Sequence, residues 1–193
     1  MSDGLNLDTS RLNIRPLIMD DFDSIHSIMN ACFGESPLEE RREWLEWTVR
    51  NTVALARLHQ PLYGERGITL KETGELIGAV GLVPAMGPYQ RLPSFRKNGE
   101  PEDKFNQPEF GLFWAIDPAH QRKGYAAEAA QAMIDYAFND MGIRRIVATT
   151  EFENEGSQAV MHKLGMTVEQ NPTPGEPFWF QVVGTLYNPK LKG

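Results

Sequence analysis

A strand, a short loop and a helix follow one another within residues 109 to 142, and this unit constrains the fold more than any other stretch. Residues Glu109 to Asp117 form an almost unbroken apolar and aromatic run between two prolines, which is typical of a strand covered on both faces. From Gly124 onward, apolar residues recur every three or four positions until Gly142, and this spacing predicts a helix with one buried face. We therefore expect a central strand that leads into a buried helix.

The loop between this strand and helix has features of an anion-binding turn. A helix N-terminus offers unpaired backbone N–H groups and the positive end of the helix dipole. Gly124 and Ala126 let a ligand approach the backbone, and Arg122 and Lys123 add positive charge. An ordinary solvated turn is the alternative, because the loop lacks the Gly-Lys-Ser/Thr ending of a nucleotide P-loop and the three glycines of a dinucleotide fingerprint.

The following fifty residues favour the anion-binding interpretation. After the helix come a second strand at Arg144 to Thr150, an Asn154-Glu-Gly-Ser157 segment and a short helix that ends at Leu164-Gly165-Met166. This order resembles the GNAT family of acetyl-CoA-dependent N-acetyltransferases. Residues Gln121 to Ala126 match that family's pyrophosphate signature, which has Gln or Arg, then Gly three residues later, then Gly or Ala two residues after that.

Within this family the chain looks most like the RimJ/RimL-type branch, whose members acetylate the N-termini of ribosomal proteins. The matching stretches are Ser10 to Pro16, Gly124 to Ala129 and Asn154 to Gly165. The resemblance covers residues 10 to 188 and implies one N-acetyltransferase domain. It implies an α/β (α+β) GNAT fold, with a mixed, mostly antiparallel sheet of six to seven strands that includes a splayed parallel pair, flanked by about four helices.

The resemblance also implies which residues hold acetyl-CoA. The pantetheine arm would pair with the backbone of the central strand, and the diphosphate would lie on the loop. Asn154 would hold the pantetheine amide. The cofactor-binding residues expected in this way are Trp114, Ala115, Ile116, Gln121, Arg122, Lys123, Gly124, Tyr125, Ala126, Asn154 and Ser157.

Direct attack of an amine on the thioester needs a base and a group that stabilises the leaving sulfur. Related enzymes often place a carboxylate base at the start of the central strand, so we expect Glu109 to be the base, with Glu151 and Glu153 as competing candidates. The tyrosine that many family members use as the acid is replaced here by Met161. In the RimJ/RimL-type branch a serine is the proposed substitute, and it corresponds to Ser157.

Asn154 and Ser157 have an alternative interpretation. Both residue types occur at helix starts, so they could do no more than cap the short helix that follows.

Composition excludes several other classes of protein. The single cysteine, Cys32, excludes an internal disulfide and a cysteine-cluster metal site, and the four histidines lack zinc-ligand spacing, so we assign no metal. The net charge of −7 argues against a nucleic-acid binder and favours a cationic acceptor. No apolar run approaches the roughly 20 residues of a membrane span, and no signal peptide is visible, so the expected location is cytoplasmic.

Periodicity predicts the remaining elements. An edge strand at Leu12 to Leu17 precedes two helices, one carrying apolar residues from Phe22 to Cys32 and one from Leu38 to about His59. A hairpin follows from Ile68 to about Pro84. The last strands are expected at Ile143 to Phe152, at Thr167 to Gln170 and at Phe178 to Tyr187.

The segment from Ala85 to Gln107 is rich in Pro, Gly and charge and shows no periodicity. The matching connection in the family is usually shorter, so we interpret residues 85 to 107 as an inserted loop near the acceptor site. A mobile surface loop without a role is the equal alternative.

The expected reaction is therefore acetyl transfer from acetyl-CoA to a primary amine, with a protein or peptide N-terminus as the acceptor that the branch implies. Two alternatives stay open. The acceptor could be a small amine such as a polyamine, an aminoglycoside or an amino acid, or the chain could be an acyl-CoA-binding module without catalysis. A homodimer is also kept open as the assembly.

Overall fold

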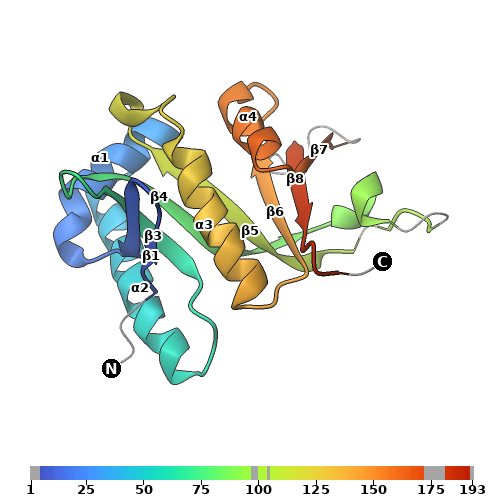
Figure 1. Ribbon diagram of the computed structural model, residues 1–193, viewed down its shortest axis with the longest axis horizontal. Helices are drawn as coiled ribbons and strands as arrows, with labels where there is room; N and C mark the ends of the chain where they lie inside the picture. Colours follow the sequence, from blue (N-terminus) through green and yellow to red (C-terminus); the bar gives the residue numbers. More distant parts are fainter. Residues whose placement is uncertain (1–4, 97–99, 104, 172–180, 192–193) are drawn as a thin grey trace. The chain divides into compact units, whose positions relative to one another are not determined.

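The computed structural model describes residues 5–96, 100–103, 105–171 and 181–191. Its described strands form one sheet of eight in the order β1-β2-β3-β4-β5-β6-β8-β7, so β5 is a central strand (Figure 1). The strands are β1 (Leu7–Asp8), β2 (Leu12–Pro16), β3 (Gly64–Leu70), β4 (Leu76–Gly87), β5 (Gln107–Ile116), β6 (Arg145–Thr150), β7 (Thr167–Gln170) and β8 (Val182–Tyr187). The α-helices within the described residues are α1 (Phe22–Phe33), α2 (Leu38–Arg57), α3 (Tyr125–Asn139) and α4 (Glu155–Lys163).

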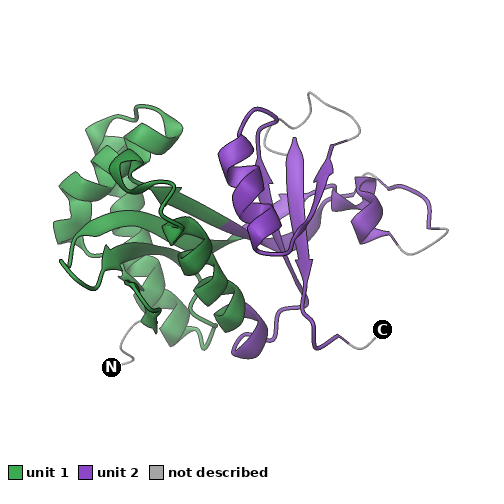
Figure 2. Cartoon of the chain, turned by 45° about the horizontal axis from the view of Figure 1, so that its top comes forward, with its two compact units in different colours: residues 1–83, 113–136 green, residues 84–112, 137–193 purple. Residues whose placement is uncertain are grey.

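The chain divides into two compact units (Figure 2). Unit 1 contains residues 1–83 and 113–136, and unit 2 contains residues 84–112 and 137–193. Strands β4 and β5 and helix α3 each contribute residues to both units.

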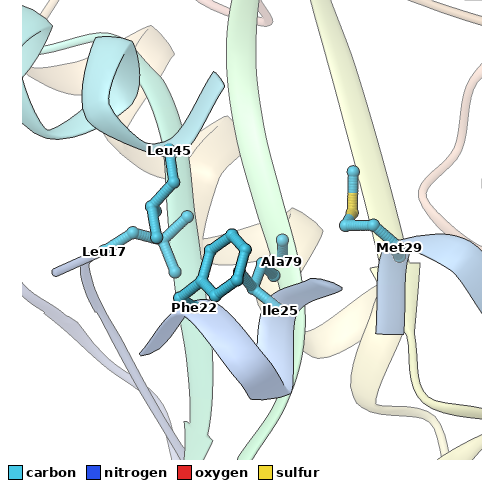
Figure 3. Close-up of a cluster of buried hydrophobic side chains, with 7 residues drawn as sticks. Leu17, Phe22, Ile25, Met29, Leu45 and Ala79 are labelled. Atoms are coloured by element: carbon cyan, nitrogen blue, oxygen red, sulfur yellow. The ribbon is translucent and has the colours of Figure 1, made fainter. Parts of the chain in front are cut away.

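Unit 1 is built on antiparallel pairing of β1 with β2, β2 with β3 and β3 with β4. Apolar residues of α1, α2 and the strands form one buried cluster, in which Phe22, Ile25 and Leu45 lie together (Figure 3). Phe22 and Ile25 are one helical turn apart in α1, so the spacing seen in the sequence does place them on the buried face.

Unit 2 contains the parallel pair of the sheet. Strands β5 and β6 pair in parallel at Phe110 with Ile146 and at Gly111 with Val147, whereas β6, β8 and β7 pair antiparallel. Helix α4 contacts all three of these last strands (Figure 1). The mixed sheet with a parallel pair and four flanking helices is the expected GNAT fold.

The structure differs from the sequence-based expectation in the number of strands, which is eight instead of six to seven. The additional strand is β1, which has only two residues and pairs Leu7 with Ile14. A two-residue strand has no periodicity of its own, so only its pairing with β2 reveals it.

The segment 85–107 contains more regular structure than its composition indicates. Strand β4 continues through Gly87, and two 3-10 turns follow at Tyr89–Arg91 and Pro93–Phe95. Tyr89, Leu92 and Phe95 are buried against Val147 of β6 and Val183 of β8. Three apolar residues therefore anchor this segment to unit 2. The expected strand residues 178–180 lie outside the described part of the chain.

Gly78 tests how tightly β4 and β5 pack. A Cβ atom at Gly78 would lie 2.2 Å from the carbonyl oxygen of Ala115, whereas a Cβ at Gly156 in α4 would meet only the Asn154 side chain at 3.7 Å. We expect Gly78→Ala to lower the free energy of unfolding by about 3 kcal/mol, because a backbone carbonyl cannot move aside cheaply. Gly156→Ala is the matched control and should raise it by about 0.5–1 kcal/mol through helix propensity. Urea unfolding of both variants checks this, and equal effects would contradict the packing argument.

Candidate functional site

Residues 121–126, here called the 121–126 loop, connect the end of β5 to the first turn of α3. A 3-10 turn at Pro118–His120 precedes the loop, and the Asp117 carboxylate caps this turn by accepting a hydrogen bond of 2.8 Å from the Ala119 amide. Pro118 cannot continue the strand ladder, so the chain leaves the sheet here.

Two residues of the 121–126 loop have a left-handed backbone conformation. Arg122 and Gly124 have φ angles of +61° and +84°, and residue 123 between them does not share this left-handed conformation. Alternation of this kind turns successive N–H groups toward one point and is a recurrent anion-binding geometry. Gly124 is better suited to a positive φ angle than Arg122, because glycine has no Cβ atom.

The first turn of α3 adds further donors. The first helical hydrogen bond runs from the Glu128 amide to the Gly124 carbonyl at 3.1 Å, so the amides of residues 125 to 127 precede the helix's own bonding pattern. Ala126 and Ala127 are small and leave these amides uncovered by long side chains. This backbone fits a diphosphate such as that of coenzyme A.

The side chains of Gln121 and Lys123 fold back onto the segment that precedes the loop. Gln121 Nε2 donates to the Ile116 carbonyl at 2.9 Å, and Lys123 Nζ donates to the Ala119 carbonyl at 3.1 Å. Arg122 is exposed and forms no ion pair with any described residue. Gln121 and Lys123 thus shape the loop, and the backbone with Arg122 is what the loop presents to solvent.

An ion pair between Arg11 and Glu128 stabilises the loop, and the sequence analysis did not predict it. Glu128 in α3 bonds Arg11 twice through its carboxylate, at 2.7 Å to Nε and 2.6 Å to Nη2. Arg11 also donates from Nη1 to the Lys123 carbonyl at 3.0 Å, and its guanidinium lies 4.4 Å from the centre of the Tyr125 ring. One arginine therefore contacts the loop, the first residue of α3 and the acid one turn further along.

Glu128 has further donors in the same N-terminal segment. Its Oε1 accepts hydrogen bonds from Thr9 Oγ1 at 2.6 Å, Ser10 Oγ at 3.1 Å and the Arg11 amide at 3.0 Å. Burial alone would raise the pKa of Glu128, but the hydrogen bonds from Thr9, Arg11 and Ser10 outweigh it and lower the pKa to about 2. Glu128 is therefore ionised throughout the neutral range.

The expected cofactor residues of β5 are partly engaged within unit 1. Ala115 and Ile116 are buried, and Trp114 is half-buried. The Ile116 carbonyl accepts from Gln121 and also from Cys32 Sγ at 3.4 Å. The role of Trp114, Ala115 and Ile116 toward pantetheine stays a prediction.

Glu109, the expected base, forms an ion pair with Arg145 of β6. The Arg145 guanidinium lies 3.8 Å from the centre of the Phe95 ring and donates from Nη1 to the Tyr187 hydroxyl at 2.8 Å. Burial would lower the pKa of Arg145, but its bonds to Glu109 and Tyr187 outweigh this and raise it. The role of Glu109 in catalysis stays a prediction.

Burial raises the pKa of the nearby Tyr89 hydroxyl, and the negative charge of Glu109 raises it further. Tyr89 is therefore neutral at physiological pH.

Asn154 and Ser157 lie at the start of α4. The Asn154 Oδ1 atom accepts a hydrogen bond of 3.0 Å from the Ser157 amide, so Asn154 is the N-cap of this helix. Capping leaves the Asn154 amide group and the Ser157 hydroxyl available for a ligand. The competing carboxylates Glu151 and Glu153 are exposed, and Met161 is fully buried.

Two absences hold for the described residues. None of their helices combines the length and the apolar character needed to cross a membrane. No group of three His, Cys, Asp or Glu side chains among them could hold a metal ion.

Comparison with known families gives one match that covers most of the chain. Residues 11–167 match the model of the acetyltransferase (GNAT) domain. Among curated proteins, the uncharacterized N-acetyltransferase YoaA of Bacillus subtilis is 28% identical over 92% of this chain and 96% of its own length. The spermidine N(1)-acetyltransferase of Escherichia coli is 27% identical over 82% of this chain and 74% of its own length. A match of 45% identity to YnaD of B. subtilis covers only 34% of this chain and 38% of that protein.

Solved structures share the fold. An acetyltransferase from Agrobacterium tumefaciens is 26% identical, with a TM-score of 0.67 over 95% of this chain and 94% of its own. A putative ribosomal-protein-serine acetyltransferase from Vibrio cholerae is 20% identical, with a TM-score of 0.67 over 97% and 99%. At that identity the second likeness concerns the fold alone.

The Glu128 pKa predicts a specific acid response. Because the folded-state pKa lies below the ordinary value of 4.5, Glu128 contributes stability above about pH 4.5 and loses this contribution as pH falls toward 2. We expect Glu128→Gln to lower the free energy of unfolding by about 1–2 kcal/mol at pH 7, and the difference from the parent protein to shrink on acidification.

Urea unfolding at pH 7, 5 and 3 measures this difference. Glu46→Gln is the control, because Glu46 pairs with Arg50 only at an exposed i,i+4 contact of 3.3 Å and should cost less than about 0.5 kcal/mol. A difference for Glu128→Gln that stays constant down to pH 3 would contradict the ion-pair account.

Proposed function

We propose that this chain, which belongs to the acetyltransferase (GNAT) domain family, transfers the acetyl group of acetyl-CoA to a primary amine. The observation that carries the proposal is the backbone of the 121–126 loop, where two left-handed residues and the unbonded amides of the α3 start meet. An anion bound there needs no specific side chain, because the donors belong to the backbone.

Acetyl-CoA supplies the activated acetyl group when it is bound. The amides of the 121–126 loop would hold its diphosphate, with Arg122 as the available cation. The backbone of residues 114–116 and the Asn154 amide group would hold the pantetheine arm. These assignments follow the family pattern, and the left-handed residues of the loop next to the α3 start support the first of them.

We propose Glu109 as the group that takes the proton of the incoming ammonium. Its ion pair with Arg145 holds the carboxylate in position near the start of β5. The Ser157 hydroxyl would donate a hydrogen bond to the departing sulfur. Met161 is fully buried and has no proton to give, so the acid must come from another residue.

For the acceptor we favour the α-amine of a protein or peptide, because the matching motifs at Ser10 to Pro16, Gly124 to Ala129 and Asn154 to Gly165 are those of the RimJ/RimL-type branch. A polyamine is the second candidate, and the 27% identity to a spermidine N(1)-acetyltransferase favours it. A binding module without catalysis is the third possibility.

Acetyl-CoA binding tests the first step. We expect calorimetry to detect acetyl-CoA association, and Gly124→Val to weaken it on the order of 10-fold, because a β-branched residue resists the +84° φ angle and reshapes the amide row. Gly142→Val is the matched control: Gly142 has a φ of +66° after α3, outside the loop. Both changes should cost about 1–2 kcal/mol of stability, but only Gly124→Val should weaken binding.

Thiol release from acetyl-CoA with a panel of amines and peptides then tests turnover. Association without release from any acceptor supports the non-catalytic module. Absence of association contradicts the proposed function.

Glu109→Gln tests the assignment of the base. We expect kcat to fall by about 10²–10⁴-fold across pH 6 to 9, the usual contribution of general base catalysis. Melting curves separate this effect from a loss of stability, since the change leaves Arg145 without its ion partner. Unchanged turnover would remove Glu109 from the mechanism, and a large loss in Glu151→Gln or Glu153→Gln instead would move the role to that residue.

A further inference from the structure

Unit 2 contains an open groove of about 740 Å³ at the starts of β5 and β6 and the end of β8. A groove of this size is in the range that holds a small molecule or a short peptide end. Its lining residues all belong to unit 2, and its charged members are Arg96, Glu109, Arg144 and Arg145. The groove therefore contains the expected base together with three arginines.

The Glu109–Arg145 ion pair forms a fixed, neutral part of this lining. Glu109 and Arg145 have side chains that are only 10% and 18% exposed. Phe95 and Tyr187 both lie against the guanidinium, at 3.8 Å and 5.2 Å from their ring centres. Because these two charges compensate each other, they add little to the net charge that a ligand meets.

The other two arginines are not compensated. Arg96 is half-buried and Arg144 is exposed, and neither forms an ion pair with any described residue. The groove thus carries a local positive excess on a chain whose net charge is −7. Charges that line one concave surface raise the local concentration of ligands of opposite charge.

The wall that carries Arg96 is fastened to the sheet. The Ser94 carbonyl accepts a hydrogen bond of 2.8 Å from the Tyr187 hydroxyl, and the Ser94 amide donates to Glu169 at 3.2 Å. Phe95, between Ser94 and Arg96, is 6% exposed. Arg96 therefore follows a segment held by both hydrogen bonds and apolar packing, so the groove does not have to be assembled by the ligand.

We propose that this groove binds an amine acceptor that also carries a carboxylate, with the carboxylate paired to Arg96 and Arg144 and the amine directed to Glu109. This inference rests on the proposed function for the identity of the reaction. An amino acid or an acidic peptide end has both groups. A polyamine has only positive charges, which Arg96 and Arg144 repel, so the groove selects against it.

A matched pair of acceptors tests the proposal. Alanyl-glutamate and alanyl-glutamine, both with an amidated C-terminus, have the same reacting amine and nearly the same size, and only the first carries a carboxylate. At saturating acetyl-CoA and low salt, we expect kcat/KM from thiol release to be about 10-fold higher for alanyl-glutamate. Free glutamate and spermidine complete the panel, so that a free amino acid, a peptide and a polycation are compared directly.

The double variant Arg96→Gln/Arg144→Gln should bring the ratio for the two dipeptides close to one. The loss should appear in KM, with kcat nearly unchanged, because neither arginine is placed at the reacting atoms. Arg50→Gln/Arg57→Gln, two exposed arginines of α2, makes the same change in net charge and is the control. It should keep the ratio of the parent protein.

The outcomes separate this inference from the proposed function. Transfer with equal kcat/KM for the two dipeptides, or with preference for spermidine, overturns the groove proposal and leaves the acetyltransferase in place. If acetyl-CoA neither binds nor releases thiol, the proposed function fails, and calorimetry with the two dipeptides then decides the groove. Tighter binding of alanyl-glutamate that the double variant abolishes supports the groove, and equal binding of both dipeptides overturns it.

Discussion

The ion pair between Arg11 and Glu128, in which two guanidinium nitrogens reach one carboxylate oxygen, is the interaction on which the arrangement of unit 1 around the 121–126 loop depends. Without it, a loop containing a non-glycine residue at φ +61° would be held only by its own hydrogen bonds. Arg11 bonds to the Lys123 carbonyl, stacks on Tyr125 and pairs with Glu128. It therefore fixes the backbone on both sides of Gly124, and the strain of the loop is offset by contacts outside it.

This arrangement explains why the loop can leave its amides open. Gln121 donates to the Ile116 carbonyl at the end of β5, and Lys123 donates to the Ala119 carbonyl in the turn that follows, so these polar side chains stabilise the corner from the segment that precedes it. A preorganised row of backbone donors binds an anion with little reorganisation. The first turn of α3 also favours anion binding, because the positive end of the helix dipole lies there.

In unit 2, the charged residues that line the groove are a half-buried ion pair and two arginines. Its ion pair between Glu109 and Arg145 is enclosed by aromatic rings and by the folded segment that contains Tyr89, Leu92 and Phe95. An enclosed pair of this kind adds specificity of position more than net stability. Arg96 and Arg144, which form no ion pair with a described residue, give the groove a positive local charge, although the net charge of the chain is −7.

Sequence alone determined the main elements and the order in which they occur. The 3.6-residue spacing predicted α1, α2 and α3, and the apolar run at Glu109 to Asp117 predicted the central strand, because local periodicity reports which face is buried. The Q-R-K-G-Y-A motif also located the loop, since its glycine and small residues are local requirements of a tight backbone turn. Strand β1 was not predicted, because a strand of two residues is too short to show a hydrophobic period.

Only the tertiary structure decided which distant residues meet. Arg11 and Glu128 are separated by 117 positions, and each stood within a recognised motif, but no local pattern pairs them. Glu109 was predicted as the base from its position in the sequence, and only the fold shows that it pairs with Arg145 from the neighbouring strand. Ion pairs and groove linings depend on strand register and on side-chain direction across the sheet, and these are consequences of the whole fold rather than of any one segment.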